Sequence, residues 1–318
     1  MAELFGPEYY SAQLSRDKTA AMVTLASDTN PGDYYYYNME TEIIVPLGSA
    51  MPWLDTTALS MMIPVSYTAR DGLVIHGYLT LPKDAVPENL PVVVNPHGGP
   101  WQRNIWGYNP EVQLLANQGY AVLQMNFRGS TGYGKDFMYA GDKQWGRAMQ
   151  DDITDGVLWL TRIGVADPER IAIFGASYGG YAALAGITLT PDLYAAAVDY
   201  VGVSNLLTFL ETIPPYWESM RQYLYDRVGD PVADYDDLYA YSPVNLVDKI
   251  VTPLFVAQGA NDPRVNKAES DQIVEALRAR GVEVDYMVKE NEGHTFAFTE
   301  NQYDFYNAMI EFLAKYLS

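Results

Sequence analysis

The sequence predicts an α/β fold in which a mostly parallel central sheet is flanked by helices. Short apolar runs typical of buried strands alternate with longer segments whose apolar residues recur at helical spacing, which is typical of parallel strand–helix units. In addition, Gly175-Ala-Ser-Tyr-Gly179 directly follows the apolar run at residues 171–174, which indicates a tight turn from a strand into a helix. We predict that residues 61–318 form this α/β domain.

The first 60 residues predict a separate, small antiparallel β segment. An apolar run at 20–25 is followed by a turn rich in Asn, Pro and Gly, by four tyrosines at 34–37, and by a second apolar run at 42–45. Short β-prone runs separated by turn residues indicate three short strands. An isolated sheet of this size is marginally stable, so we expect the rest of the chain or a second subunit to cover it.

The elements of the larger domain follow in chain order. One arm of an antiparallel hairpin is expected at 71–78. The later predicted strands are 92–95, 121–125, 171–174, 195–198, 253–257 and 282–288, and the predicted helices are 145–163, 268–280 and one that begins at Ser177. Because the carboxyl ends of parallel strands meet at one edge of a sheet, residues that follow these strands are candidates for a functional site.

Ser177 lies between two glycines at the predicted turn from strand to helix. This arrangement is typical of a nucleophile elbow, in which a strained backbone lifts the serine hydroxyl out of the sheet and glycines avoid collisions with neighbouring elements. The start of the helix also directs backbone N–H groups toward a developing oxyanion. A Gly-rich turn of any doubly wound sheet is the alternative interpretation.

A nucleophilic serine in this setting needs an acid and a base later in the chain, in the order Ser, Asp or Glu, His. Asp262 follows the predicted strand at 253–257, and His294 follows the predicted strand at 282–288. Both leave the same edge of the sheet as Ser177, so we predict a triad of Ser177, Asp262 and His294. An ordinary Asn-Asp-Pro turn is the alternative for Asp262.

The other two histidines suit other roles. His76 lies in the predicted hairpin arm and is interpreted as a half-exposed strand residue. His97 opens His97-Gly-Gly-Pro100 after the strand at 92–95, where a Gly-Gly pair supplies the second oxyanion donor in folds with a nucleophile elbow. We therefore interpret His97 as structural and Gly99 as the residue that presents its N–H, with a plain turn as the alternative.

Residues 204–250 separate two predicted strands by more than a normal crossover and are unusually aromatic. A long connection over a functional edge is commonly a binding element. We predict that aromatic side chains here and just after His97 form a wall for an apolar or aromatic acyl group, with packing between helices as the alternative. These side chains are Trp101, Trp106, Tyr108, Phe209, Tyr216 and Trp217.

Composition excludes several classes of function. A formal net charge of −20 repels nucleic acids and anionic membranes, so neither is expected as a partner. The chain has no cysteine, which excludes disulfides and thiol catalysis. No apolar run could span a membrane, and the N-terminus lacks the features of a secretory signal, so a cytoplasmic location is expected. No acidic cluster includes His or Cys at ligand spacing, so neither a metal nor another cofactor is expected.

Five segments resemble the prolyl oligopeptidase family, and most closely its acylaminoacyl-peptidase and dipeptidyl-peptidase-like branch. They lie in the expected order within about residues 64–318, and they are His97-Gly-Gly-Pro-Trp101, Asn126-Phe-Arg-Gly-Ser-Thr-Gly-Tyr-Gly134, Gly175-Ala-Ser-Tyr-Gly-Gly-Tyr181, Gly259-Ala-Asn-Asp-Pro-Arg-Val265 and Glu292-Gly-His294. The resemblance implies an α/β-hydrolase fold, the triad above, and an oxyanion hole made by the N–H groups of Gly99 and Tyr178. It also implies a serine hydrolase that acts through an acyl-enzyme on short peptides, acyl-amino acids or small esters.

The chain also departs from this family. Full-length members carry a propeller ahead of the hydrolase domain, and residues 1–60 resemble only one blade of it. We therefore expect small esters to be better substrates than long peptides. A carboxylesterase with little or no peptidase activity is one alternative, and a non-catalytic binding module is another. The aromatic N-terminal segment also predicts homo-oligomerisation. Thr295, where the family more often has glycine, affects the pose expected for the histidine loop.

Overall fold

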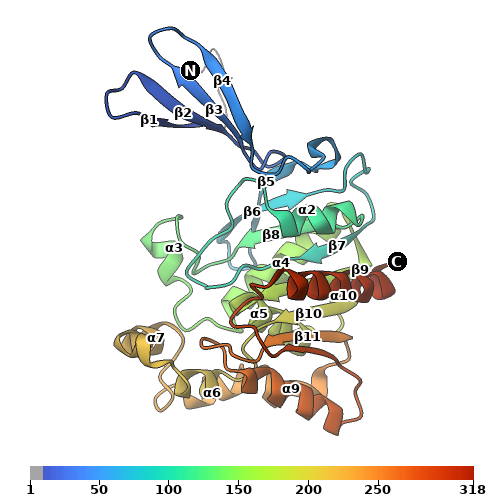
Figure 1. Cartoon of the computed structure of the whole chain (residues 1–318). Coiled ribbons are helices and arrows are strands. Elements are labelled where there is room, and N and C mark those ends of the chain that lie inside the picture. The colour runs from blue at the N-terminus through green and yellow to red at the C-terminus, as the bar shows by residue number, and fades with distance from the viewer. Residues whose placement is uncertain (1–9) are drawn as a thin grey trace.

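The computed structural model describes residues 10–318, and residues 1–9 of the predicted N-terminal segment lie outside the described residues. Two sheets organise the described chain (Figure 1). A four-stranded sheet has the order β1-β2-β3-β4, and an eight-stranded sheet has the order β12-β11-β10-β9-β7-β8-β6-β5. Figure 1 places the four-stranded sheet, in blue, at one end of the molecule, beyond the edge of the large sheet.

The N-terminal sheet has one strand more than the sequence predicted. Its antiparallel strands are β1 (Tyr10–Leu14), β2 (Ala20–Leu25), β3 (Asp33–Asn38) and β4 (Ile44–Ser49). The sequence prediction missed β1, although Tyr10-Ser-Ala-Gln-Leu14 alternates apolar and polar residues as a half-buried strand does. On the sheet's covered face Ala21, Val23 and Tyr37 form a small apolar core.

The large sheet is mostly parallel, as the sequence predicted. A hairpin of β5 and β6 is antiparallel, β6 also pairs antiparallel with β8, and the remaining neighbouring pairs are parallel. The strands are β5 (Met62–Thr68), β6 (Val74–Thr80), β7 (Leu90–Val94), β8 (Ala121–Asn126), β9 (Ala166–Ala176), β10 (Ala196–Tyr200), β11 (Leu254–Gly259) and β12 (Asp285–Lys289). The central strands are fully buried because helices cover both of their faces, which explains their continuous apolar runs.

Helices lie on both faces of this sheet, which confirms the predicted α/β-hydrolase fold (Figure 1). One face packs on α2 (Pro110–Asn117) and α10 (Thr299–Leu317). The other face packs on α4 (Ala148–Arg162), α5 (Tyr178–Leu189) and α9 (Lys267–Ala279). A short helix, α3 (Lys135–Tyr139), lies between β8 and α4.

The connection from β10 to β11 is helical rather than a simple loop. It contains α6 (Leu206–Glu211), α7 (Arg221–Arg227), α8 (Tyr235–Ala240) and two 3-10 helices, Pro215–Met220 and Pro243–Lys249. Buried Glu269 on α9 accepts hydrogen bonds from the backbone N–H groups of Ser204 and Asn205, at 3.0 and 2.8 Å. These bonds fix the start of the connection against α9.

The N-terminal sheet is joined to the large domain by buried polar contacts. Asp28 accepts a hydrogen bond from the Met62 N–H at 2.6 Å, and Gln113 on α2 donates to the carbonyls of Asp28 and Ser60.

None of the helices formed by residues 10–318 is long and apolar enough to cross a membrane. The same described residues contain no cluster of three or more His, Asp or Glu side chains arranged to hold a metal ion.

Candidate active site

Ser177 occupies a strained turn between β9 and α5. Its φ of 60° and ψ of −117° lie outside the regions that non-glycine residues ordinarily adopt. The flanking glycines are required by close approach: a Cβ at Gly175 would lie 2.4 Å from the backbone of Gly179, and one at Gly179 would lie 2.3 Å from the Pro96 carbonyl oxygen. The local sequence therefore permits a turn that presents Ser177 at the edge of the sheet.

Ser177, His294 and Asp262 form a chain of two hydrogen bonds. The distance from His294 Nε2 to Ser177 Oγ is 2.9 Å, and that from His294 Nδ1 to Asp262 Oδ2 is 2.8 Å. Asp262 follows β11 and His294 follows β12, so neighbouring parallel strands deliver both side chains to the same edge. The structure thus brings together the three residues that the sequence selected.

Hydrogen bonds hold the Asp262 carboxylate in one orientation. Its Oδ1 accepts from the N–H groups of Arg264 and Val265 at 2.8 and 3.0 Å, and the Gln258 amide donates to Oδ2 at 3.2 Å. Because this buried carboxylate accepts from His294 Nδ1, the hydrogen-bond pattern assigns the ring proton to Nδ1. His294 Nε2 is then free to accept the proton of Ser177.

Glu292 closes the loop that carries His294. This buried carboxylate accepts hydrogen bonds from the N–H groups of Ala297 and Phe298, at 2.7 and 2.9 Å, and from the Asn301 amide at 2.7 Å. Burial opposes ionisation, but these donors together hold the pKa of Glu292 below its ordinary value. Because Phe298 is the N-cap residue of α10, these bonds attach the start of that helix to the loop that carries His294.

Gly99 and Tyr178 both border the space in front of Ser177. Tyr178 is the first residue of α5, so its N–H is one of the unpaired donors at a helix N-terminus. Gly99 has a φ of 118°, and a Cβ there would lie 2.9 Å from the Trp101 nitrogen, so glycine is needed. Next to it, a Cβ at Gly98 would lie 3.5 Å from Ser177 Cβ, which shows how closely this loop approaches the serine.

A cavity of about 400 Å³ opens beside Ser177 and His294. Three of the six predicted aromatic residues, Trp101, Phe209 and Trp217, line it. Further lining residues that the sequence did not select include Trp145, Val203, Met220, Leu224, Arg264 and Val265. The sequence did not indicate Trp145 as a lining residue, because it is far from Phe209 in the chain. Folding brings the two rings to a centroid distance of 6.1 Å.

The other three predicted aromatic residues do not line this cavity. The Trp106 indole N–H donates to the Met62 carbonyl at 2.9 Å, which ties the loop to β5. Tyr108 lies just before the N-cap of α2 and is not one of the lining residues. Tyr216 is 59% exposed, and its hydroxyl lies 3.5 Å from the Pro263 carbonyl. The structure therefore does not place these three side chains in the lining of the cavity, because aromatic content along a loop does not determine which side chains turn inward.

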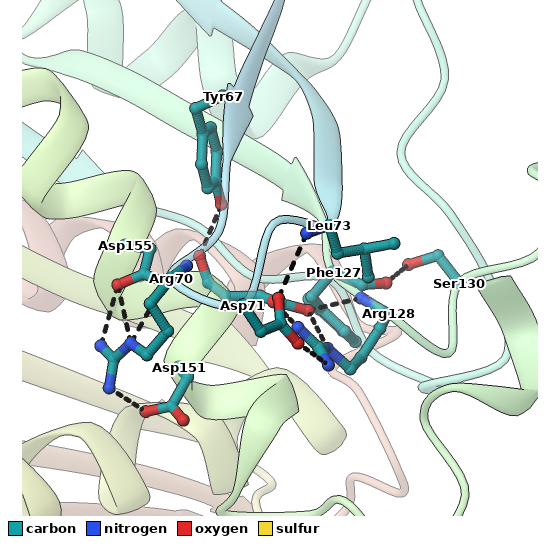
Figure 2. Close-up of polar contacts among 10 residues, drawn as sticks. Tyr67, Arg70, Asp71, Leu73, Phe127, Arg128, Ser130, Asp151 and Asp155 are labelled. Carbon is teal, nitrogen blue, oxygen red and sulfur yellow. Dashed lines mark hydrogen bonds and ion pairs between the residues drawn. The ribbon is translucent and has the colours of Figure 1, made fainter.

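A buried ion pair anchors the turn after β8. Arg128 donates to Asp152 from Nε and Nη2, at 2.9 and 2.7 Å, and to Asp71 from Nη1 at 2.7 Å. Figure 2 shows Arg128 beside Asp71, with the Ser130 hydroxyl directed at the Phe127 carbonyl. The turn after β8 is thus attached to both α4 and the β5–β6 hairpin.

Comparison with known proteins identifies the family of this chain. The model of the prolyl oligopeptidase family matches residues 106–318. Dipeptidyl aminopeptidase BIII of Pseudoxanthomonas mexicana is 46% identical over 311 residues, which is 95% of this chain and 45% of that enzyme. Dipeptidyl peptidase family member 6 of Caenorhabditis elegans is 37% identical over 96% of this chain and 44% of its own length. The chain therefore spans less than half the length of these relatives.

Solved structures give the same result. The structure of a Mycobacterium tuberculosis puromycin-hydrolyzing peptidase superimposes with a TM-score of 0.86 at 30% identity, over 98% of this chain and 48% of that one. The matched family region includes Ser177, Asp262 and His294, which the fold places within hydrogen-bonding distance of one another. By fold, family match and sequence identity, the chain belongs to the prolyl oligopeptidase family of serine hydrolases.

Proposed function

We propose that this chain hydrolyses small acyl esters and short peptides through an acyl-enzyme formed on Ser177. The observation that supports this most directly is the continuous hydrogen-bonded series from Ser177 Oγ through His294 to the buried Asp262 carboxylate. A strained serine at a helix N-terminus, an imidazole within 2.9 Å and a fixed carboxylate are the groups that acyl transfer requires.

In the first half of the reaction, Ser177 Oγ attacks the substrate carbonyl carbon while its proton passes to His294 Nε2. Asp262 holds the Nδ1–H tautomer and stabilises the imidazolium that forms. The N–H groups of Gly99 and Tyr178 receive the oxyanion, and one such donor contributes about 3–4 kcal/mol to transition-state stabilisation. The bond to the alcohol or amine then breaks, and His294 returns the proton to that leaving group.

In the second half, His294 takes a proton from water, and the hydroxide attacks the acyl carbon. The tetrahedral intermediate collapses with cleavage of the bond to Ser177 Oγ, which regains its proton from His294. The products are the free acid and the regenerated enzyme.

The cavity favours an apolar acyl group with no free ammonium. Its lining is dominated by the side chains of Trp101, Trp145, Phe209, Trp217 and Leu224. Among the lining residues within 10–318, Arg264 is the only lysine or arginine, and there is no aspartate or glutamate. A free N-terminal amine would lose its hydration without meeting a carboxylate there, so blocked acyl-amino acids and esters should bind better.

A carboxylesterase with little peptidase activity is the second candidate, and the same apolar lining favours it. The two functions are distinguished by specificity constants for a panel of p-nitrophenyl esters, acyl-amino-acid amides and dipeptidyl amides. We expect esters and acyl-amino-acid amides to exceed dipeptidyl amides of the same P1 residue. A preference for the dipeptidyl amides, which the names of the curated relatives suggest for those enzymes, would contradict this substrate assignment.

The mechanism is tested with Ser177→Ala and a fluorophosphonate probe. We expect labelling of Ser177 in the wild type, and a loss of more than about 10⁴-fold in kcat/KM in the variant without a change in fold. His294→Ala should cost nearly as much, and the double variant little more, because the residues act as a unit. Activity of Ser177→Ala within tenfold of the wild type would exclude Ser177 as nucleophile, and an inactive wild type would favour a binding module.

We also propose that the N-terminal sheet forms a contact between two copies of the chain. Its face away from the Ala21–Val23–Tyr37 core exposes Met22, Tyr36 and Val45, which lie in one cross-strand row. Association of two such faces would bury apolar side chains that are otherwise exposed to water.

A further inference from the structure

We propose that Trp145 is the end wall of the acyl pocket and sets the longest acyl chain that the enzyme accepts. This inference rests on the proposed function, in which an acyl group enters the cavity beside Ser177. Trp145 lines that cavity together with Ser177 and His294. It also lines a second cavity, of about 20 Å³, to which neither Ser177 nor His294 contributes. Among residues 10–318, Trp145 is the only one that lines both cavities, so its indole separates the two spaces.

The second cavity is suited to apolar atoms. Three of its lining residues are buried apolar side chains, namely Leu206, Val228 and Leu238. Its charged lining residues are already paired with one another at the surface, as Lys143–Asp234 and Arg147–Asp237. Cavities lined by apolar side chains stay dry and bind apolar molecules. Removal of the Trp145 indole would therefore extend the acyl pocket into a space that an alkyl chain can fill.

Aromatic rings hold the Trp145 indole in place. It meets Tyr178 edge to face with a centroid distance of 4.6 Å, and its ring centroid lies 5.1 Å from that of Tyr181. On another side it stacks on Phe209 with an interplanar angle of 24°. Trp145 is only 5% exposed, so it cannot swing aside without loss of these contacts. Because Tyr178 is the residue after Ser177, this wall stands close to the reacting serine.

The backbone segment that carries Trp145 is fixed as well. The Lys143 N–H donates to the Arg227 carbonyl at the end of α7, at 2.7 Å. On the other side of the indole, Arg147 forms an ion pair with Asp237 on α8 at 3.0 Å. The exposed ion pair adds little by itself, but the backbone bond and the ring contacts together keep the segment in one position. Trp145 is therefore a rigid wall.

A rigid end wall makes the reaction depend on the length of the acyl chain. Each methylene that moves from water into an apolar cavity should raise kcat/KM about fourfold. A chain that reaches the Trp145 indole must bend or displace it, so further methylenes should stop raising kcat/KM and then lower it. The acyl length with the highest kcat/KM thus measures the distance from Ser177 to the wall.

The test is Trp145→Ala with a series of straight-chain p-nitrophenyl esters from acetate to laurate. We expect the preferred acyl length to increase by about two carbons or more, and the ratio of kcat/KM for laurate to that for acetate to rise roughly tenfold or more. Trp217→Ala is the matched control, because Trp217 lines the same cavity, is partly exposed to solvent and does not border the second cavity. It removes the same side chain, but the preferred acyl length should not change.

Two results would overturn the proposal. One is an unchanged preferred acyl length in Trp145→Ala, and the other is an equal increase in Trp217→Ala, which would mean that any enlargement of the cavity has this effect. If Trp145→Ala does not fold, Trp145→Phe decides, since it keeps an aromatic ring beside Tyr178 and shortens the wall. We then expect an increase of about one carbon, and no increase would refute the role of Trp145.

Failure of the proposed function is recognised separately, by absence of fluorophosphonate labelling of the wild-type Ser177. If the wild type is labelled but hydrolyses no ester, the rates of labelling by fluorophosphonates of increasing alkyl length replace the ester series. The preferred alkyl length should then increase in Trp145→Ala and not in Trp217→Ala, and any other pattern would contradict the proposal.

Discussion

Asp199 is a fully buried carboxyl directly behind the nucleophile elbow. It lies on β10 opposite Gly175, and the next residue, Tyr200, accepts a hydrogen bond from the Ser177 N–H at 2.9 Å. Burial raises its pKa to about 7; the Gly202 N–H opposes this shift, and Glu269 adds to it. The group therefore resists ionisation at a position that supports Ser177.

The raised pKa makes Asp199 a source of pH-dependent instability. Below pH 3.8 both folded and unfolded chains hold the proton, so the carboxyl has no effect. Between that value and about 7 only the unfolded chain ionises, and the free energy of unfolding falls as pH rises, by up to about 4 kcal/mol. We expect Asp199→Asn to be no more stable than the wild type at pH 4 and more stable by about 1–4 kcal/mol at pH 8, measured by urea unfolding.

Asp192→Asn provides the control for this measurement, since Asp192 is exposed in the turn before β10. It should change the free energy of unfolding by less than about 0.5 kcal/mol at either pH. Equal stabilisation by Asp199→Asn at pH 4 and pH 8 would contradict the assigned ionisation and indicate a packing effect instead.

Single residues differ in how far the sequence predicts them. Ser177, Asp262 and His294 could be selected because each follows a strand and their chain order is restricted by the fold. Asp199 and Trp145 could not be selected, because the residues around them come from distant segments of the chain. Glu269 influences Asp199, and Phe209 packs beside Trp145. Contacts of this kind leave no local pattern in the sequence.

At the level of elements, the loop before α10 depends on one side chain, Glu292. Its lowered pKa means that it stabilises the fold above its ordinary value of 4.5 and that this stabilisation is lost as pH falls through the lowered folded value. Glu292→Gln replaces a carboxylate by an amide whose NH₂ would face a backbone N–H. We expect a loss of about 2–3 kcal/mol at pH 7, a smaller loss near pH 3, and a fall in kcat because His294 loses its fixed position.

Glu300→Gln is the matched control, because Glu300 lies exposed in the first turn of the same helix. It removes the same charge near the N-terminus of α10 and should cost less than about 1 kcal/mol, with kcat unchanged. If the two variants behaved alike, the effect would be due to the helix dipole rather than to closure of the loop. The measurements are thermal unfolding against pH and steady-state kinetics well below the unfolding midpoint.

Strong periodicity made the principal elements predictable, while weak signals were missed. The predicted helix at 268–280 corresponds to α9, and the predicted strand at 121–125 corresponds to β8. The helices between β10 and β11 were not predicted individually, because each is shorter than two full turns or is interrupted near Pro214-Pro215. Their fold depends on tertiary contacts such as that of Glu269 with Ser204.

At the scale of the whole molecule, the N-terminal sheet lies away from the cavity. None of the residues that line the cavity comes from the described part of this segment, 10–60. The sheet is attached to α2 and β5 through Asp28 and Gln113 instead. The small antiparallel sheet was predictable from its alternation and turns, but its site of attachment was not, since single polar residues make the junction.

The exposed row of Met22, Tyr36 and Val45 leads to a prediction about assembly. These side chains are 40–44% exposed and directly opposite one another on β2, β3 and β4. A lysine at Tyr36 would place a charge at the centre of the proposed contact between copies, where it would lose its hydration without a partner. We therefore expect Tyr36→Lys to convert a dimer of the wild type into a monomer, measured by light scattering during size-exclusion chromatography. Its kcat/KM for small esters should stay within twofold of the wild type, because the row lies outside the cavity.

Leu158→Lys supplies the comparison for this experiment, since Leu158 is a similarly exposed apolar residue, at 43%, on α4. It adds the same charge to a surface for which no contact is proposed, and so the dimer should persist. A monomeric wild type at micromolar concentration, or a Tyr36→Lys variant that remains a dimer, would show that the row does not join two copies. Dissociation by Tyr36→Lys but not by Leu158→Lys would locate the contact on the N-terminal sheet. Only the lysine at position 36 would have to be buried without a partner when two copies meet.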